Sequence, residues 1–367
     1  MCNKDIPFQL ALRQVPNIGD IQARILLQKF GSAEAVFNTP VKCLEKTEGI
    51  GTIRARSIKN HRITERIYAE IDFCQKYGIA ILLQTDEKYP KRLLQCNDAP
   101  FVLFAKGNAD LNAKKMVGIV GTRANTEYGK HCCEQLIADL SQLEVTIVSG
   151  LAYGIDTIAH KQSLKQQLPT IAVLAHGLDT IYPANNRNLA TAILENGTLL
   201  TEYLSGTPPD KQNFPGRNRI TAGLCDALVV VETGKKGGSL ITADLALGYH
   251  RDVFAFPGRA TDLKSEGCNN LIAENKAQLI TSAEELVASM LWGKKKKSPS
   301  TKQSEMFQQL TESELQIFAI IEQQQPIHID NIRLYTQLTN SLLANTILSL
   351  EIKGIVRQQP GNHYTLN

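Results

Sequence analysis

The middle of the chain alternates short apolar runs with longer stretches of helical pattern. The alternation extends from residue 76 to about residue 292. It predicts β-α units in a doubly wound, mostly parallel sheet, which is an α/β fold. The predicted strands are 79–83, 101–104, 116–120, 145–148, 170–175, 198–200, 227–231 and 252–256. In such folds ligands bind outside the carboxyl ends of the strands.

The predicted strand 227–231 has the most distinctive neighbours. It is a continuous apolar run, typical of a strand that is buried on both faces of a sheet. The helix predicted before it carries Arg217, Asn218 and Arg219 in its first turns. A glycine turn follows the strand and leads into another helix; its residues are Gly237, Gly238 and Ser239. Two guanidinium groups and a glycine-lined helix start predict a phosphate site, if the fold brings them together.

Small residues also follow four of the other predicted strands. Arg123 and Arg259 lie beside two of these strand ends. One glycine turn is weak evidence, because glycine ends many strands for steric reasons. Several such turns along one sheet edge predict an anion-binding edge. The residues assigned to it here are Gly121, Thr122, Arg123, Ser149, Gly150 and Gly154.

The N-terminal residues 1–75 contain two stretches that echo each other. VPNIGDIQARIL spans residues 15–26, and TEGIGTIRARSI spans residues 47–58. Each has an Ile-Gly pair before a helix with basic residues, which resembles paired helix-hairpin-helix units of an all-α, SAM-like domain. Such turns can direct backbone amides at a nucleic-acid phosphate. Glycines that merely cap helices are the alternative, and the sequence leaves both open.

The C-terminal residues 305–367 are predicted to form a separate domain after a charged, turn-rich linker, 293–304. Three helical patterns are followed by a β-hairpin around a Pro360-Gly361 turn, which is the plan of a winged helix. The helical patterns span 311–323, 328–336 and 339–353. Residues 305–367 contain six acids and three bases, whereas phosphate neutralisation needs clustered cations. We therefore interpret this domain as protein-contacting or regulatory.

Composition and charge narrow the classes of function. The 367 residues have a net charge of +4, so any nucleic-acid surface must come from local clustering. The eight cysteines include no C-x-x-C pair, and His160, His176 and His250 show no metal-ligand spacing. No apolar stretch reaches transmembrane length, and the N-terminus lacks a signal-peptide pattern. We therefore expect a soluble, cytoplasmic protein with reduced thiols, no metal and no membrane association.

Five collinear segments of the middle region resemble the DprA family of DNA-processing proteins, also called Smf. They read GTR at 121–123, SGLAYGIDTIAH at 149–160, HGLDTIYPANN at 176–186, FPGRNRITAGL at 214–224 and GGSLITA at 237–243. The resemblance implies an extended Rossmann-like domain, residues 76–292, that forms a homodimer. It implies binding and protection of single-stranded DNA, and loading of the RecA recombinase in natural transformation. The DNA groove that it implies is lined by Arg123, Ser149, Gly150, Arg217, Asn218 and Arg219.

Several of these residues have a second interpretation. The two arginines before strand 227–231 could form ion pairs with Glu232 or Asp244. We favour phosphate, because arginines flanking an asparagine at a helix start match phosphate better. Three acids beside turns are interpreted as cap or turn residues rather than catalysts: Asp156, Asp179 and Asp226. Three aromatic residues beside the motifs could stack on bases or could belong to the core: Tyr153, Tyr182 and Phe214.

A nucleotide-binding or nucleotide-cleaving enzyme is the alternative function. The lysine-decarboxylase-like phosphoribohydrolases have a similar glycine turn, P-G-G-x-G-T-x-x-E, whose glutamate performs the chemistry. Aligning Gly238-Ser239 with that G-T places Thr242 at the glutamate position. A hydroxyl group cannot replace a carboxylate as general base without an activating partner. The sequence therefore predicts a binding protein without enzymatic activity and without a cofactor.

Overall fold

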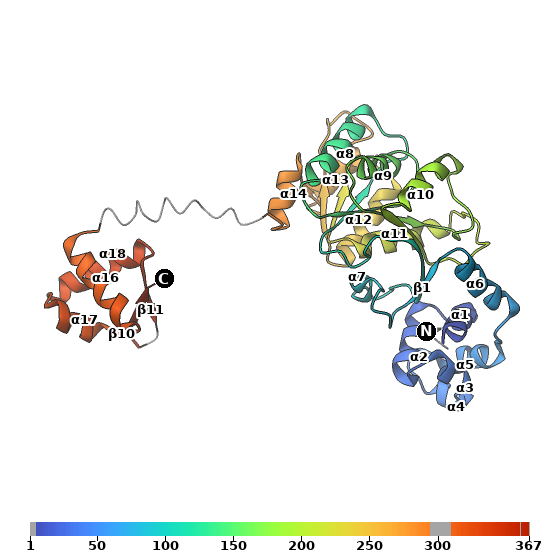
Figure 1. Ribbon diagram of the computed structural model, residues 1–367, viewed down its shortest axis with the longest axis horizontal. Coiled ribbons are helices and arrows are strands. Elements are labelled where there is room, and N and C mark those ends of the chain that lie inside the picture. The colour runs from blue at the N-terminus through green and yellow to red at the C-terminus, as the bar shows by residue number, and fades with distance from the viewer. Residues whose placement is uncertain (1–4, 294–309, 360, 367) are drawn as a thin grey trace. The chain divides into compact units, whose positions relative to one another are not determined.

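A computed structural model of the protein describes residues 5–293, 310–359 and 361–366. Contacts divide the chain into two compact units, residues 1–292 and 293–367. We call the first the sheet unit and the second the winged-helix unit (Figure 1). The predicted linker lies outside the described residues, apart from residue 293.

The sheet unit is built on one sheet, which has nine strands within the described residues. Their order is β1-β2-β6-β5-β4-β3-β7-β8-β9. Strands β3 to β9 are parallel, whereas β2 pairs antiparallel with β1 and β6. The chain therefore changes winding direction between β3 and β7. The bounds are β1 Ala80–Leu83, β2 Val102–Gly107, β3 Met116–Val120, β4 Thr146–Ser149, β5 Thr170–Leu174, β6 Gly197–Thr201, β7 Ala227–Val230, β8 Asp252–Ala255 and β9 Gln278–Leu279.

The predicted α/β fold with a mostly parallel sheet is confirmed. Strand β3 has the predicted bounds, and β7 ends one residue earlier than predicted. Every residue of β7 is fully buried, because Val229 packs into the core on one face of the sheet and Val230 into the core on the other. Strand β9 was not predicted, since its two residues are exposed and carry no apolar run.

Helices cover both faces of the sheet. The core on one face joins Ile119 and Val229 to α8, α9 and α14. The core on the other face joins Leu228 and Val230 to α11, α12 and α13. Thr126 caps α8 through a hydrogen bond that its side chain accepts from the backbone N–H of Gly129. The helices are α7 Lys91–Leu94, α8 Glu127–Leu140, α9 Ile155–Lys165, α10 Arg187–Ile193, α11 Asn213–Leu224, α12 Gly238–Gly248, α13 Glu266–Ala273 and α14 Ala283–Ser289.

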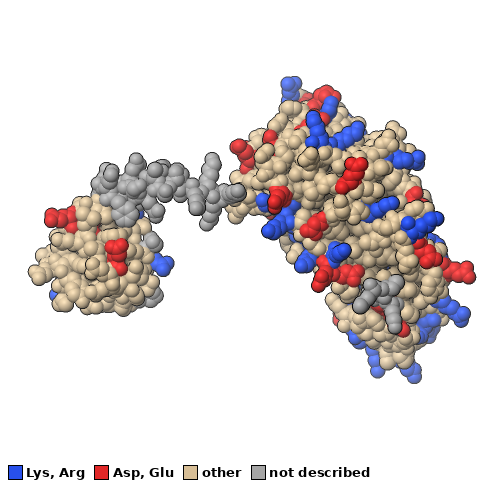
Figure 2. Space-filling model, viewed as in Figure 1, with Lys and Arg blue, Asp and Glu red and all other residues tan. Residues whose placement is uncertain are grey.

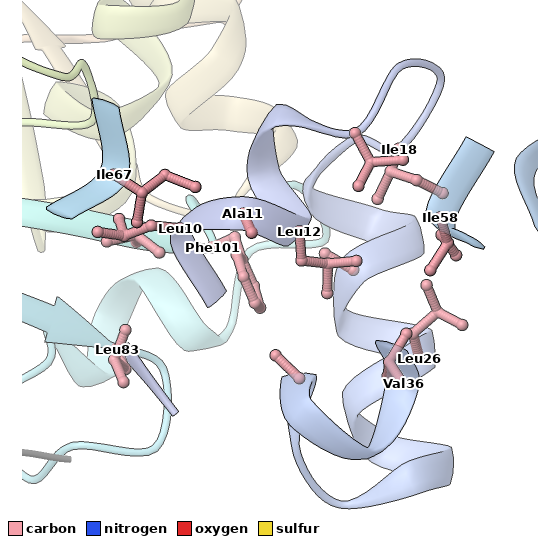
Figure 3. Close-up of a cluster of buried hydrophobic side chains, with 14 of the residues drawn as sticks. Leu10, Ala11, Leu12, Ile18, Leu26, Val36, Ile58, Ile67, Leu83 and Phe101 are labelled. Atoms are coloured by element: carbon pink, nitrogen blue, oxygen red, sulfur yellow. The ribbon is translucent and has the colours of Figure 1, made fainter. Parts of the chain in front are cut away.

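Six helices precede the sheet within the described residues: α1 Ile6–Gln14, α2 Asp20–Phe30, α3 Ala33–Asn38, α4 Val41–Glu45, α5 Gly51–Asn60 and α6 Glu65–Lys76. Figure 1 shows them in blue, gathered at one end of the sheet unit. Their buried side chains share a core with Leu83 of β1 and with Phe101, as Figure 3 shows. The helices are thus packed onto the sheet edge, and the separate helix-hairpin-helix domain stays a prediction.

The winged-helix unit has the predicted plan of three helices and a hairpin. A third short strand, β10, joins the hairpin in the order β10-β12-β11. Ile317, Ile347 and Tyr364 belong to its core. The predicted turn residue Pro360 lies outside the described residues. The bounds are α16 Glu312–Gln324, β10 Ile327–His328, α17 Ile329–Thr336, α18 Asn340–Ile352, β11 Val356–Gln359 and β12 His363–Leu366.

Glu314 joins α16 to α18 inside this unit. The residue is 3% exposed, and its carboxylate accepts hydrogen bonds from Ser349 Oγ at 2.7 Å and from Lys353 Nζ at 2.6 Å. The backbone N–H of Thr311 donates a third bond at 2.7 Å. Burial raises the pKa of Glu314, but these hydrogen bonds outweigh burial and hold the pKa lowered to about 2.

Acid should therefore destabilise the winged-helix unit through Glu314. Because the folded pKa lies below the ordinary value of 4.5, the contribution to the free energy of unfolding is present above pH 4.5 and is lost as the pH falls towards 2. Glu314→Gln should destabilise a 305–367 fragment by about 1–3 kcal/mol at pH 7, and by much less at pH 3. Urea unfolding followed by circular dichroism measures both values. An equal loss at the two pH values would contradict this assignment.

Candidate nucleic-acid interface

A depression lies at the carboxyl ends of β3, β4 and β5, beside the first turn of α11. It is shallow: the empty space over it, open solvent included, amounts to about 340 Å³. We call it the arginine–aromatic pocket; it is lined by Arg123, Gly150, Ala152, Tyr153, Leu174, Ala175, His176, Tyr182, Pro183 and Phe214. Five of these residues were predicted from sequence, and they come from four separate segments of the chain.

Phe214 is the central side chain of the arginine–aromatic pocket. Arg123 Cζ lies 4.9 Å from its ring centroid, and Arg217 Cζ lies 5.9 Å from it. The ring of Tyr182 stands edge-on to Phe214, with the centroids 6.3 Å apart. Arg123 is exposed, and Tyr182 and Tyr153 are 43% and 44% exposed. The pocket therefore offers solvent a cation beside aromatic side chains.

Arg217 lies beneath this surface and is only 6% exposed. Its guanidinium group is 3.7 Å from Asp156 Oδ2 and donates a hydrogen bond to Val173 O at 3.3 Å. Burial lowers the pKa of Arg217, the Asp156 carboxylate opposes this, and the charge on Arg123 lowers the pKa further. A Cβ at Gly150 would lie 1.1 Å from Arg217 Nη1, so any other residue there would displace the Arg217 guanidinium group. Arg217 is thus ion-paired, although not with Glu232 or Asp244, and its predicted phosphate contact stays a prediction.

Arg219 points away from the arginine–aromatic pocket. Its Nη2 lies 2.7 Å from Glu202 Oε2 and 2.9 Å from Asp20 Oδ2. The Arg13 guanidinium group contacts both the main-chain oxygen and the carboxylate of Glu202. Burial alone lowers the pKa of Arg219, but Glu202 and Asp20 outweigh burial and raise it. Ion pairing, the alternative that the sequence left open, is therefore present here and links α11 to the N-terminal helices, while the phosphate contact predicted for Arg219 stays a prediction.

Other predicted site residues shape the strand ends from within. Ser149 is fully buried and donates from Oγ to Ile119 O at 2.7 Å, which ties β4 to β3. Gly154 has a φ of +73°, and a Cβ there would lie 2.2 Å from Thr122 O. Gly121 packs as closely, since its Cβ would lie 2.5 Å from a side-chain carbon of Ile155. These residues are required by the close packing of the loops, whatever the loops bind.

The glycine turn after β7 does not line the arginine–aromatic pocket. A Cβ at Gly237 would lie 1.9 Å from Thr233 Oγ1, whereas Gly238 is exposed with open space around it. Ser239 is 6% exposed, and its Oγ donates to Thr233 Oγ1 at 2.8 Å. Asn218 is half-buried on α11, next to Arg217. The phosphate contacts predicted for these residues remain predictions.

The three acids hold a helix start or a turn, as predicted. Asp156 accepts a hydrogen bond from the backbone N–H of Ala152 at 3.3 Å. Asp179 accepts one from Gly206 at 2.8 Å. Asp226 accepts hydrogen bonds from the backbone N–H of Met116 in β3, at 2.9 Å, and from Arg92 Nε, at 2.6 Å. Each carboxylate thus joins two segments of the fold.

The two N-terminal glycine turns lie side by side. Arg54 donates to Asn17 O at 2.9 Å and to Gly49 O at 2.8 Å, so one side chain bonds both turns. Arg24 donates to Cys96 O at 3.1 Å and thus points towards the sheet. Arg56 is exposed. Two of the three arginines of the echoed stretches therefore bond to carbonyl groups of the protein.

Sequence analysis missed the role of His176. This residue is 2% exposed, and its Nε2 accepts a hydrogen bond from the backbone N–H of Tyr182 at 3.2 Å. Burial lowers the pKa of His176, which favours the neutral ring that this bond needs. Metal-ligand spacing does not indicate this role, whereas the position of His176 directly after β5 is a usable signal in the sequence. Its function is to hold the loop that carries Tyr182.

Among the described residues, no group of three or more histidine, cysteine or acidic side chains could hold a metal ion. None of their helices is both long and apolar enough to cross a membrane.

Comparison with known families and proteins gives consistent matches. Residues 80–291 match the family model of DNA recombination-mediator protein A, and residues 300–362 match that of the DprA winged helix domain. A Synechocystis protein named Smf is 33% identical over 99% of both chains. The Streptococcus pneumoniae DNA processing protein DprA is 45% identical over 55% of this chain and 71% of its own length.

Solved structures agree with these matches. The crystal structure of DNA processing protein A from Streptococcus pneumoniae covers 77% of this chain and 97% of its own, with a TM-score of 0.65 and 34% identity. The Helicobacter pylori DNA processing protein A, described for its single-stranded DNA binding mode, covers 59% and 96%, with a TM-score of 0.54 and 32% identity. The chain belongs to the DprA family of DNA recombination-mediator proteins, also named Smf.

Proposed function

We propose that the protein binds single-stranded DNA at the arginine–aromatic pocket. The observation that carries the proposal is the exposed Arg123 stacked over Phe214, with Tyr182 and Tyr153 beside them. Proteins that bind single strands without sequence preference combine cations for the backbone with aromatic rings on which bases stack. The Helicobacter pylori relative, whose title names a single-stranded DNA binding mode, supports the same assignment.

The aromatic rings of the pocket favour a single strand over a duplex. Bases of a duplex are stacked on one another, so their faces are not available to Phe214 or Tyr182. An unpaired base can reach the rings while the adjoining phosphate meets Arg123. Arg217 lies beneath the same ring and is paired with Asp156, so Arg123 is the exposed cation beside Phe214 that can meet the phosphate. We therefore propose binding that is largely indifferent to base identity.

The finer assignments follow from family membership. We propose that the protein protects incoming or processed single strands in the cytoplasm and loads the RecA recombinase onto them during natural transformation. We also propose that it acts as a homodimer. The description of the matching family as a recombination mediator supports a role in strand transfer.

We propose that the protein has no enzymatic activity. Thr242, which takes the place of the glutamate in the phosphoribohydrolase turn, is 2% exposed within α12. The neighbouring acid, Asp244, is exposed and lies 3.7 Å from Lys276 Nζ. A buried hydroxyl group and a solvent-facing carboxylate do not provide a general base for nucleotide cleavage.

We assign the winged-helix unit to protein contact rather than DNA contact. Figure 2 shows that the visible face of this unit is largely uncharged. On α18, the helix that reads DNA in many winged helices, Leu348 and Ile352 are 54% and 78% exposed. The only base near its end, Lys353, is bound to Glu314. Such a face lacks the clustered cations that phosphates require.

A fragment of residues 1–292 should therefore retain most of the single-strand affinity of the whole chain, within about threefold. Fluorescence anisotropy with a labelled thymidine oligonucleotide compares the two. The matched control is a 305–367 fragment at the same concentrations and salt. If that fragment binds as tightly as residues 1–292, the assignment of the winged-helix unit is wrong.

The proposed function is tested by gel shift with single-stranded and duplex DNA of one sequence across a salt series. We expect tighter binding of the single strand at every salt concentration. We also expect affinity to fall with rising salt, because bound phosphates release counterions. Equal affinity for both forms of DNA would refute the proposal.

A further inference from the structure

Arg123 lies in a short loop, residues 121–126. Glu232, two residues after the end of β7, binds this loop at both of its ends. The backbone N–H of Thr122 donates to the main-chain oxygen of Glu232 at 2.7 Å. At the far end of the loop, Thr126 N donates to Glu232 Oε2 at 2.8 Å, and Thr126 Oγ1 donates to Oε1 at 2.6 Å. Glu232 is 1% exposed. Both ends of the loop are thus fixed by a single buried residue.

The start of α8 is shaped to receive the Glu232 carboxylate. A Cβ at Gly129, in the first turn of the helix, would lie 2.4 Å from Glu232 Oε2, so glycine leaves the room that the carboxylate needs. A carboxylate at a helix N-terminus is also stabilised by the helix dipole. The loop is confined on another side by Gly154, where a Cβ would lie 2.8 Å from Arg123 Cα.

We propose that Glu232 is a positioning residue for DNA binding. It lies outside the arginine–aromatic pocket, yet it fixes the loop that holds Arg123 over Phe214. A pre-ordered arginine loses less conformational freedom when it binds a phosphate, which increases affinity. The inference rests on the proposed function of the pocket. It also gives Glu232 a role that differs from the ion pair considered from sequence.

Glu232→Ala should weaken binding of a thymidine oligonucleotide about three- to tenfold, the effect of losing a helix cap that orders the loop. The affinity of Glu232→Gln should lie between those of Glu232→Ala and the wild type, because one acceptor oxygen remains. Gly129→Ala should reproduce the loss by displacing the carboxylate, although alanine favours helices. The matched control is Gly248→Ala on α12, where an added Cβ meets no atom within 4 Å, and its affinity should be unchanged.

A double-mutant cycle with Arg123→Ala separates positioning from general damage. If Glu232 acts through Arg123, adding Glu232→Ala to Arg123→Ala should cost less than about twofold in affinity. An additive loss would overturn the proposal. Should Glu232→Ala not fold, Gly129→Ala takes its place in the cycle.

Amide hydrogen exchange in the absence of DNA gives a second test. Exchange in residues 121–126 should be faster in Glu232→Ala or Glu232→Gln than in the wild type, while strand β7 should be unchanged. Unchanged exchange in the loop would overturn the positioning role, whatever the DNA result. Failure of the wild-type protein to bind single strands would instead overturn the proposed function.

Discussion

Replacing Arg219 by alanine should destabilise the sheet unit by about 3–5 kcal/mol, because the buried Glu202 carboxylate loses its nearer cation and keeps only the more distant Arg13 side chain. Glu202 is 4% exposed and lies 2.7 Å from the Arg219 guanidinium group, and Asp20 lies 2.9 Å from it. Burial raises the pKa of Glu202, and Arg219 is the first of the charges that oppose this shift. Chemical unfolding followed by the fluorescence of Trp292, the single tryptophan, measures the loss.

The loss should depend on pH with a definite sign. Without Arg219 the folded pKa of Glu202 rises further above its unfolded value, so the protonated form is favoured in the folded state. Stability is then retained at low pH and lost as the pH rises through the folded pKa. Arg219→Ala should therefore cost less at pH 5 than at pH 8. Adding Glu202→Gln should restore part of the loss at pH 8, and an Arg219→Ala variant as stable as the wild type would refute the buried network.

Replacing Arg123 by alanine should weaken single-strand binding about tenfold while leaving stability unchanged. Arg123 is exposed and has no carboxylate partner among the described residues, so its charge is available to a phosphate. The loss should be similar for all base sequences. The dependence of log affinity on log salt should become shallower by about 0.7, the value for one phosphate contact of a single strand.

The matched control is Lys165→Ala. Lys165 is also an exposed cation, but it ends α9 at the opposite edge of the sheet. The Lys165→Ala substitution removes the same net charge as Arg123→Ala, so a general electrostatic effect would weaken DNA binding equally in both variants. Equal affinities of Arg123→Ala and the wild type would show that the pocket has been misplaced.

The sequence predicted the strands well because each central strand is a continuous apolar run. It also placed Arg123, Tyr182 and Phe214 at strand and helix ends that the fold brings together. This succeeded because the carboxyl ends of parallel strands share one edge. Strand β9 escaped prediction, since two exposed residues paired by tertiary contact leave no pattern.

The fate of the arginines could not be predicted from local sequence. Arg219 and Asp20 are 199 residues apart, and only the tertiary fold brings their side chains together. Arg217 meets Asp156 from a different helix. A pattern shows that a guanidinium group lies at a helix start, but it does not show which way that group points. The proposed phosphate contact therefore rests mainly on Arg123, which is exposed beside Phe214.

Photocrosslinking of a 5-iododeoxyuridine oligonucleotide, mapped by mass spectrometry, tests the central claim most directly. Halogenated bases crosslink to aromatic side chains on which they stack. If DNA binds at the arginine–aromatic pocket, crosslinks should form at Phe214, Tyr182 or Tyr153. The crosslink at position 214 should disappear in the Phe214→Ala variant. Crosslinks confined to the turns at residues 47–58 or to α18 would contradict the account and move the DNA site to another part of the chain.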